Sequence, residues 1–211
     1  MIGVDEAGKG AVLGSMFVAA VEYRPGSVED DVDGRLDDSK RLSSETRTDM
    51  EEVLREMSHY VLEVKTDEVD RYVEEGRMNH LVAESHAHVL EKVKTEPEKV
   101  SAVVDASDVS TERFEKRVTE KTGFDGDVTA EHDADSKYGC VMAASVLAKV
   151  ERDRHIEEYG VGSGYPSDPR TRKYLENYVE TNEELPKIAR TSWSTSKQML
   201  EKISQSSFDE F

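Results

Sequence analysis

Short apolar runs alternate along this chain with longer segments in which apolar residues recur at helical spacing. The runs predict strands over residues 1–5, 15–23, 60–64, 100–105 and 127–131. The longer segments predict helices over residues 44–57, 67–75, 79–93, 110–121 and 138–158. The second run is apolar almost throughout, so we expect it to pair antiparallel with the first in a sheet covered on both faces. Strands that alternate with helices indicate an α/β fold.

Two adjacent carboxylates, Asp5 and Glu6, follow the first apolar run and lead into the turn Gly8-Lys9-Gly10. Side chains alternate between faces along a strand, so this pair can converge on one site only where the strand ends. Glycines permit unusual backbone angles and leave main-chain N–H groups open to a ligand. Carboxylates that bind a hard cation, beside a bare backbone and a lysine, suit the handling of phosphate. The alternative for an isolated Asp-Glu pair is an ordinary strand end.

Asp105 ends a later apolar run, and Asp135 lies between the last predicted strand and the most apolar helix. An acid at the C-terminal end of a strand lies where α/β sheets place ligands. Asp108 is more simply interpreted as the N-cap of the following helix, outside the site.

The histidines and the single cysteine do not form a zinc site. His80, His86 and His88 are spaced by six and two residues, unlike the i, i+4 pair that places two ligands on one helical face. We therefore expect them to be solvated or packed. Cys140 precedes a stretch, residues 141–148, that is apolar nearly all round and should be buried. One cysteine allows no intrachain disulfide, and no leader or membrane span is recognisable, so we expect a cytoplasmic protein.

The formal net charge of −18 over 211 residues points away from nucleic acid, because phosphate binding normally requires a basic surface. The acids recur along the whole chain, however, rather than forming one tail. At molar salt the Debye length is about 3 Å, and such self-repulsion is tolerated. We therefore expect a halophilic host, with a higher unfolding midpoint in molar KCl than in dilute buffer. Equal midpoints would contradict this expectation.

The segment Asp5-Glu6-Ala7-Gly8-Lys9-Gly10 resembles the N-terminal signature of type 2 ribonucleases H (ribonuclease HII), in its archaeal form. Further family segments follow in the family's order, and that order is more specific than any single motif. They are Asp38-Ser39-Lys40-Arg41-Leu42, His132-Asp133-Ala134-Asp135 with residues 143–149 and 152–153, Gly164-Tyr165-Pro166-Ser167-Asp168-Pro169, and Arg190-Thr191-Ser192-Trp193-Ser194-Thr195.

The resemblance implies a ribonuclease H-like mixed sheet flanked by helices, with a small helical C-terminal extension. It divides the chain into a catalytic domain (residues 1–158), a substrate-binding extension (159–204) and a possible clamp-binding tail (205–211). We expect Trp193 to pack the last helix onto the body, and the protein to be a monomer.

By the same resemblance, four acids are catalytic and bind two Mg²⁺ or Mn²⁺ ions: Asp5, Glu6, Asp105 and Asp135. Asp133 stands where the family usually has Lys, which adds negative charge beside the metals and leaves open which carboxylate of this segment binds. The implied enzyme is an endoribonuclease that hydrolyses the RNA strand of RNA–DNA hybrids. It also nicks duplex DNA 5′ to embedded ribonucleotides, leaving 5′-phosphate and 3′-hydroxyl ends.

The resemblance also assigns substrate contacts, namely Gly8, Lys9, Gly10, Ser39, Lys40 and Tyr165. The tail residues Gln205, Phe208 and Phe211 resemble a sliding-clamp-binding box, although the box usually ends in two aromatics and this chain has one. A frayed polar tail is the alternative. Two other functions are weighed: another ribonuclease H-like nuclease, such as a resolvase or a type 3 ribonuclease H, and a non-catalytic clamp adaptor on a decayed nuclease body.

Overall fold

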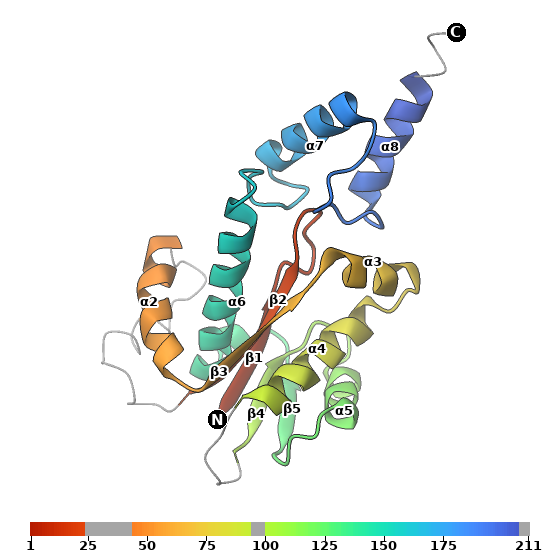
Figure 1. Cartoon of the computed structure of the whole chain (residues 1–211). Coiled ribbons are helices and arrows are strands. Elements are labelled where there is room, and N and C mark those ends of the chain that lie inside the picture. The colour runs from red at the N-terminus through yellow and green to blue at the C-terminus, as the bar shows by residue number, and fades with distance from the viewer. Residues whose placement is uncertain (24–43, 94–99, 207–211) are drawn as a thin grey trace. The chain divides into compact units, whose positions relative to one another are not determined.

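The computed structural model describes residues 1–23, 44–93 and 100–206, with only the backbone described for residues 44–49 and 203–206. Along the chain the elements are β1 (Ile2–Ala7), β2 (Met16–Glu22), α2 (Ser44–Glu56), β3 (His59–Val64), α3 (Thr66–Glu74), α4 (Met78–Lys92), β4 (Ala102–Asp105), α5 (Thr111–Lys121), β5 (Val128–Glu131), a short 3₁₀ helix (Ala134–Ser136), α6 (Gly139–Glu157), α7 (Pro169–Asn182) and α8 (Ser194–Ser206) (Figure 1). The predicted strands and helices are confirmed to within two residues at their ends.

The sheet is mixed, with strand order β3-β2-β1-β4-β5. β1 pairs antiparallel with β2, from Ile2 opposite Glu22 to Ala7 opposite Phe17. β4 runs parallel to β1 and also to β5. The expected antiparallel pairing of the first two strands and the mixed α/β sheet are therefore confirmed.

The described chain forms two compact units, each gathered from segments distant in sequence. The first contains Met1–Ala7, Phe17–Glu63 and Met78–Glu151, and the second contains Gly8–Met16, Val64–Arg77 and Arg152–Phe211. The first unit holds most of the sheet. None of the helices in the described ranges is long and apolar enough to cross a membrane.

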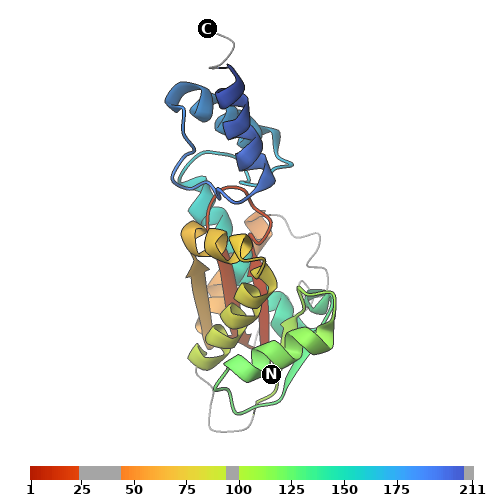
Figure 2. The same cartoon turned by 90° about the vertical axis from the view of Figure 1, so that its right-hand side faces the viewer.

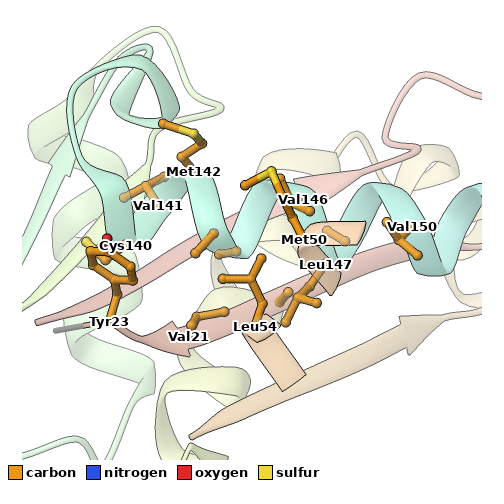
Figure 3. Close-up of a cluster of buried hydrophobic side chains, with 14 of the residues drawn as sticks. Val21, Tyr23, Met50, Leu54, Cys140, Val141, Met142, Val146, Leu147 and Val150 are labelled. Atoms are coloured by element: carbon orange, nitrogen blue, oxygen red, sulfur yellow. The ribbon is translucent and has the colours of Figure 1, made fainter. Parts of the chain in front are cut away.

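Helices cover both faces of the sheet in the first unit. α2 and α6 lie on one side, and α4 and α5 lie on the other (Figures 1 and 2). In the first layer Met50 and Leu54 of α2 pack with Val21 of β2 and Leu147 of α6, all fully or almost fully buried (Figure 3). Every residue of β2 is buried, because helices cover both faces of the sheet, and this accounts for the nearly continuous apolar run of the strand. The expected burial of Cys140 and of the apolar stretch after it is confirmed.

Gly3 is where β1 comes closest to α6. A Cβ added at Gly3 would lie far inside van der Waals contact distance of the main-chain carbonyl carbon of Cys140. That neighbour is backbone at the start of a buried helix and cannot swing away. Gly3 therefore allows the strand and the helix to pack at this distance.

We expect Gly3→Ala to lower the free energy of unfolding by about 3 kcal/mol, because the strand and helix must move apart. Urea denaturation in high KCl would measure the change. Gly76→Ala is the control: Gly76 has a φ of +67° with no atom near its added Cβ, so it reports only backbone strain, about 1 kcal/mol. Equal losses in the two variants would contradict the steric explanation.

The second unit has its own smaller core. Val12, Leu13, Ile156, Val161 and Leu175 are buried there, and the ring of Trp193 packs against them just before α8 begins. α7 starts with a strong cap, since the Asp168 carboxylate accepts hydrogen bonds from the N–H groups of Arg170 and Ser163, at 2.9 and 2.6 Å.

Candidate active site

β1 continues through both of its acids. Asp5 pairs with Ala19 of β2, and Glu6 pairs with Val18. The predicted strand end at residue 5 is wrong, because the apolar partner strand continues the backbone ladder to Ala7 whatever the side chains are. Strand alternation then sends Asp5 and Glu6 to opposite faces of the sheet. Asp5 shares the face of Gly3, against α6, and is only 7% exposed.

The two remaining acids meet at the C-terminal end of β4. Asp105 is the last residue of β4, directly after the pair formed by Val4 and Val104. Its Oδ1 accepts a hydrogen bond from the N–H of Ala134, at 2.7 Å. That bond ties the 3₁₀ turn that carries Asp135 to the end of the strand. Folding therefore brings acids from positions 5, 105 and 135 to one region of the first unit.

These carboxylates are close enough to influence one another's ionisation. Burial raises the pKa of Asp5 well above its ordinary value, and the charges of Glu6 and Asp105 raise it further. Burial also raises the pKa of Asp105, with contributions from Glu6 and Asp135 that the N–H of Ala134 opposes. Asp135 therefore acts on this group, whereas the charge of Asp133 helps to raise the pKa of Lys137. The backbone of Asp133 adopts the left-handed helical conformation, with a φ of 53°.

The donor set fits a hard divalent cation by its chemistry, although its carboxylates do not meet at one point in this structure. Within the described residues, no three Asp, Glu, His or Cys side chains stand together so that they could hold a metal ion. Both Glu6 and Asp105 are hydrogen-bonded to protein groups. Carboxylates gathered in one region are nevertheless the oxygen ligands that Mg²⁺ and Mn²⁺ prefer.

Sequence reasoning missed the partner of Glu6. His86 of α4 is fully buried, and its Nε2 lies 2.9 Å from Glu6 Oε2. The expectation that the histidines of this helix are packed is confirmed for His86, but the contact with a site acid was not foreseen. A signal was available: His86 follows Val82 by four residues and precedes Leu90 by four, on the buried face of the helix.

The glycine turn belongs to the second unit, and a buried arginine of the same unit holds it by hydrogen bonds. Gly8 is left-handed, with a φ of +86°, and an added Cβ would lie 3.0 Å from the carbonyl oxygen of Ser15. Arg190, fully buried, donates to the carbonyl oxygens of Lys9 at 2.8 Å and Gly14 at 3.0 Å. One guanidinium therefore fixes the carbonyl of Lys9 within the turn and that of Gly14, four residues after the turn.

Tyr165, the other predicted substrate-sensing residue, lies beside the turn within the same unit. A Cβ added to Gly10 would lie 4.0 Å from Cε1 of the Tyr165 ring. The guanidinium of Arg152 lies over this ring, 4.6 Å from its centroid, and Arg152 also donates to the carbonyl oxygen of Ser163. The ring is thus supported on one side by a buried cation.

Asp70 of α3 anchors the segment that carries Arg190. Its Oδ2 accepts from the N–H and hydroxyl of Thr191, at 2.7 and 2.9 Å. Its Oδ1 accepts from the N–H of Ser192, at 3.0 Å, and from the Ser192 hydroxyl. No local pattern identifies Asp70, because all four partners lie more than 120 residues away in the sequence.

The predicted capping role of Asp108 is wrong. Ser110 is the N-cap of α5 and accepts from the N–H of Arg113. The buried carboxylate of Asp108 instead accepts from Arg113 Nε at 3.1 Å and from Arg117 Nη1 at 2.6 Å. The Arg113 guanidinium holds the pKa of Asp108 well below its ordinary value, which leaves Asp108 committed to a structural ion pair.

Several predicted contacts cannot be placed. Ser39, Lys40, Phe208 and Phe211 lie outside the described residues, and Gln205 lies in α8 with only its backbone described. Their assignments as substrate or clamp contacts stay predictions.

Comparison with known proteins agrees over nearly the whole chain. A family model described as Ribonuclease HII matches residues 2–196. Ribonuclease HII of Halobacterium salinarum is 45% identical over 216 residues, covering 99% of this chain and 98% of that protein. The crystal structure of the ribonuclease H2 from Pyrococcus horikoshii OT3 is similar with a TM-score of 0.86 and 36% identity, covering 97% of this chain and 98% of that one. The PCNA:RNase HII complex from Archaeoglobus fulgidus includes a chain similar with a TM-score of 0.81 and 38% identity, covering 94% and 95%.

Proposed function

The chain belongs to the ribonuclease HII family and is a metal-dependent endoribonuclease, and from this premise we propose which of its residues perform the reaction. It hydrolyses the RNA strand of RNA–DNA hybrids and nicks duplex DNA 5′ to embedded ribonucleotides, leaving 5′-phosphate and 3′-hydroxyl ends. The proposed catalytic and metal-binding residues are Asp5, Glu6, Asp105 and Asp135.

The observation that carries this assignment is that folding brings these acids close enough to act on one another. Besides burial, Glu6 and Asp105 raise the pKa of Asp5, and Glu6 and Asp135 raise the pKa of Asp105. We propose two Mg²⁺ or Mn²⁺ ions as the cofactors. When bound, such ions supply an activated water and stabilise the leaving 3′ oxygen. The carboxylates hold the positive charge in place, and the buried setting of Asp5 limits competing water.

Ribose recognition is assigned to the second unit. The 2′-hydroxyl distinguishes RNA from DNA at a given position. We propose that the main chain of Gly8, Lys9 and Gly10, with the ring of Tyr165, senses this hydroxyl. Two observations favour this role: Arg190 fixes the carbonyl of Lys9 in the turn, and the guanidinium of Arg152 lies over the Tyr165 ring. Lys9 would contact phosphate as a point charge without a bidentate fork.

The proposed function is tested by incubating the protein with a duplex that contains one ribonucleotide, in Mg²⁺ or Mn²⁺ and high KCl, and mapping the cut. We expect one nick 5′ to the ribonucleotide and none in the matched all-DNA duplex. Binding without a cut under every metal condition would instead support the non-catalytic clamp adaptor.

We also propose that the tail binds a sliding clamp, since Gln205, Phe208 and Phe211 follow the spacing of a clamp-binding box and a PCNA complex is known for the similar protein from Archaeoglobus fulgidus. Replacing both Phe208 and Phe211 by Ala should weaken binding to immobilised PCNA of the same host at least tenfold. Cleavage of a short duplex without PCNA should be unchanged. The control replaces Ser206 and Ser207 by Ala, and equal PCNA binding by both double variants would overturn the tail assignment.

A further inference from the structure

His86 lies on α4 with a fully buried ring and two nitrogens in very different surroundings. Nε2 lies 2.9 Å from Glu6 Oε2, whereas Nδ1 is buried without a hydrogen-bond partner. The rings of His86 and Phe114 meet edge to face, with centroids 5.3 Å apart. One nitrogen therefore meets a site carboxylate, and the rest of the ring packs in the core.

The orphan nitrogen determines which tautomer is favoured. A proton on Nδ1 would bury an N–H without an acceptor, which is costly in a protein interior. A proton on Nε2 instead forms the hydrogen bond to Glu6. His86 is therefore the donor at Nε2, and one oxygen of the Glu6 carboxylate is the acceptor.

Glu6 depends on such support more than the other acids do. It leaves β1 on the face opposite to Asp5, and its longer side chain has more rotamers than an aspartate. The side chain is nevertheless 8% exposed, held by a fully buried ring. A bond to Oε2 fixes the carboxylate plane and leaves Oε1 as a ligand for a cation. Groups that hold metal-binding side chains in this way typically change metal affinity 10- to 100-fold.

We propose that His86 is a positioning residue, which orients Glu6 for divalent-cation binding through the hydrogen bond from Nε2. The inference rests on the proposed function, because it takes Glu6 as a metal ligand. His88, two residues along the same helix, has a different environment: its ring meets that of Tyr60, with centroids 5.9 Å apart. It serves as the matched control.

Mn²⁺ binding to the substrate-free protein, measured by calorimetry in high KCl, tests the proposal. His86→Leu keeps apolar bulk but removes the donor, and we expect at least tenfold weaker binding. His86→Gln restores a side-chain N–H and should recover part of the loss. His88→Leu should bind Mn²⁺ as the unaltered chain does. In a Glu6→Ala background His86→Leu should have no further effect, because its influence passes through Glu6.

An equal loss from His86→Leu with and without Glu6 would assign His86 a merely structural role and overturn the proposal. Should His86→Leu fail to fold, nitrogen-15 NMR of the unaltered protein decides instead. We expect the Nε2–H tautomer at His86. When Mg²⁺ is added in the absence of Mn²⁺, the ring signals of His86 should move and those of His88 should not. An Nδ1–H tautomer, or Mg²⁺ binding that leaves the His86 signals unmoved, would overturn it. Absence of any metal binding by the unaltered chain would instead remove the proposed function.

Discussion

Asp5→Asn is expected to lower the rate of cleavage at least 1,000-fold and, at the same time, to stabilise the metal-free fold. The first effect follows because Asn replaces a charged ligand at the centre of the acid group, and such a loss of electrostatic stabilisation typically costs that much in rate. Hybrid binding should largely survive, because Asp5 is buried and the proposed substrate contacts lie elsewhere. Asp135→Asn should give the same loss of cleavage.

The sign of the stability effect follows from the pKa of Asp5. Burial, Glu6 and Asp105 raise that pKa above the ordinary 3.8, so the folded protein holds this proton more tightly than the unfolded chain does. Metal-free stability is therefore greatest at low pH and falls as the pH rises from 3.8 through the raised value. At neutral pH the raised pKa of Asp5 therefore makes the metal-free fold less stable, and Asn, which does not ionise, removes this penalty.

Urea denaturation at neutral pH, first with chelator and then with Mn²⁺, measures the free energy of unfolding of both proteins. A cleavage assay measures their turnover. The variant should be the more stable protein in chelator, and the order should reverse in Mn²⁺, because a bound ion stabilises only the chain that can hold it. Asp125→Asn, at an exposed position, is the control and should change neither value. Undiminished turnover in Asp5→Asn would remove the proposed chemistry, and a less stable variant in chelator would contradict the origin assigned to the raised pKa.

The framework of the fold is readable in the sequence because its signals are local. The continuous apolar run of β2 predicts a strand buried on both faces, and the apolar surface of α6 predicts a buried helix. The end of β1 was misjudged for a physical reason. Carboxylates normally mark the edge of an apolar run, but here the partner strand supplies backbone pairing to Ala7, so that Asp5 and Glu6 lie within the sheet.

The four acids proposed for the site come from the family resemblance, whereas the residues that contact and hold them cannot be read from the sequence. His86 contacts a residue 80 positions earlier, and Asp70 contacts residues 121 and 122 positions later. A single buried polar residue on an apolar helical face reveals burial but not its partner. Such pairs depend on how elements pack, which no local spacing encodes. Asp108 shows the same limit, since its arginine partners displaced the expected cap.

Asp70→Ala is expected to have the largest effect on the second unit. The substitution leaves the N–H groups of Thr191 and Ser192, and their two hydroxyls, without their acceptor. Each hydrogen bond to a charged group contributes about 2 kcal/mol, so loss of the two N–H bonds alone should cost about 4 kcal/mol of unfolding free energy. Asp70→Asn keeps one acceptor oxygen and should lose roughly half as much.

The functional consequence passes through Arg190, the residue next to Thr191. Arg190 fixes the carbonyl oxygens of Lys9 and Gly14, so a loosened segment should release the turn proposed to sense ribose. We expect kcat/KM for a single-ribonucleotide duplex to fall at least tenfold in Asp70→Asn, with Mn²⁺ affinity unchanged, because the bonds of Asp70 all lie within the second unit. Asp67→Ala, at an exposed position in the first turn of α3, is the control and should cost at most about 0.5 kcal/mol. A loss of Mn²⁺ affinity equal to the loss in kcat/KM would show that Asp70 acts on the acids, and unchanged cleavage would show that the turn does not depend on this anchor.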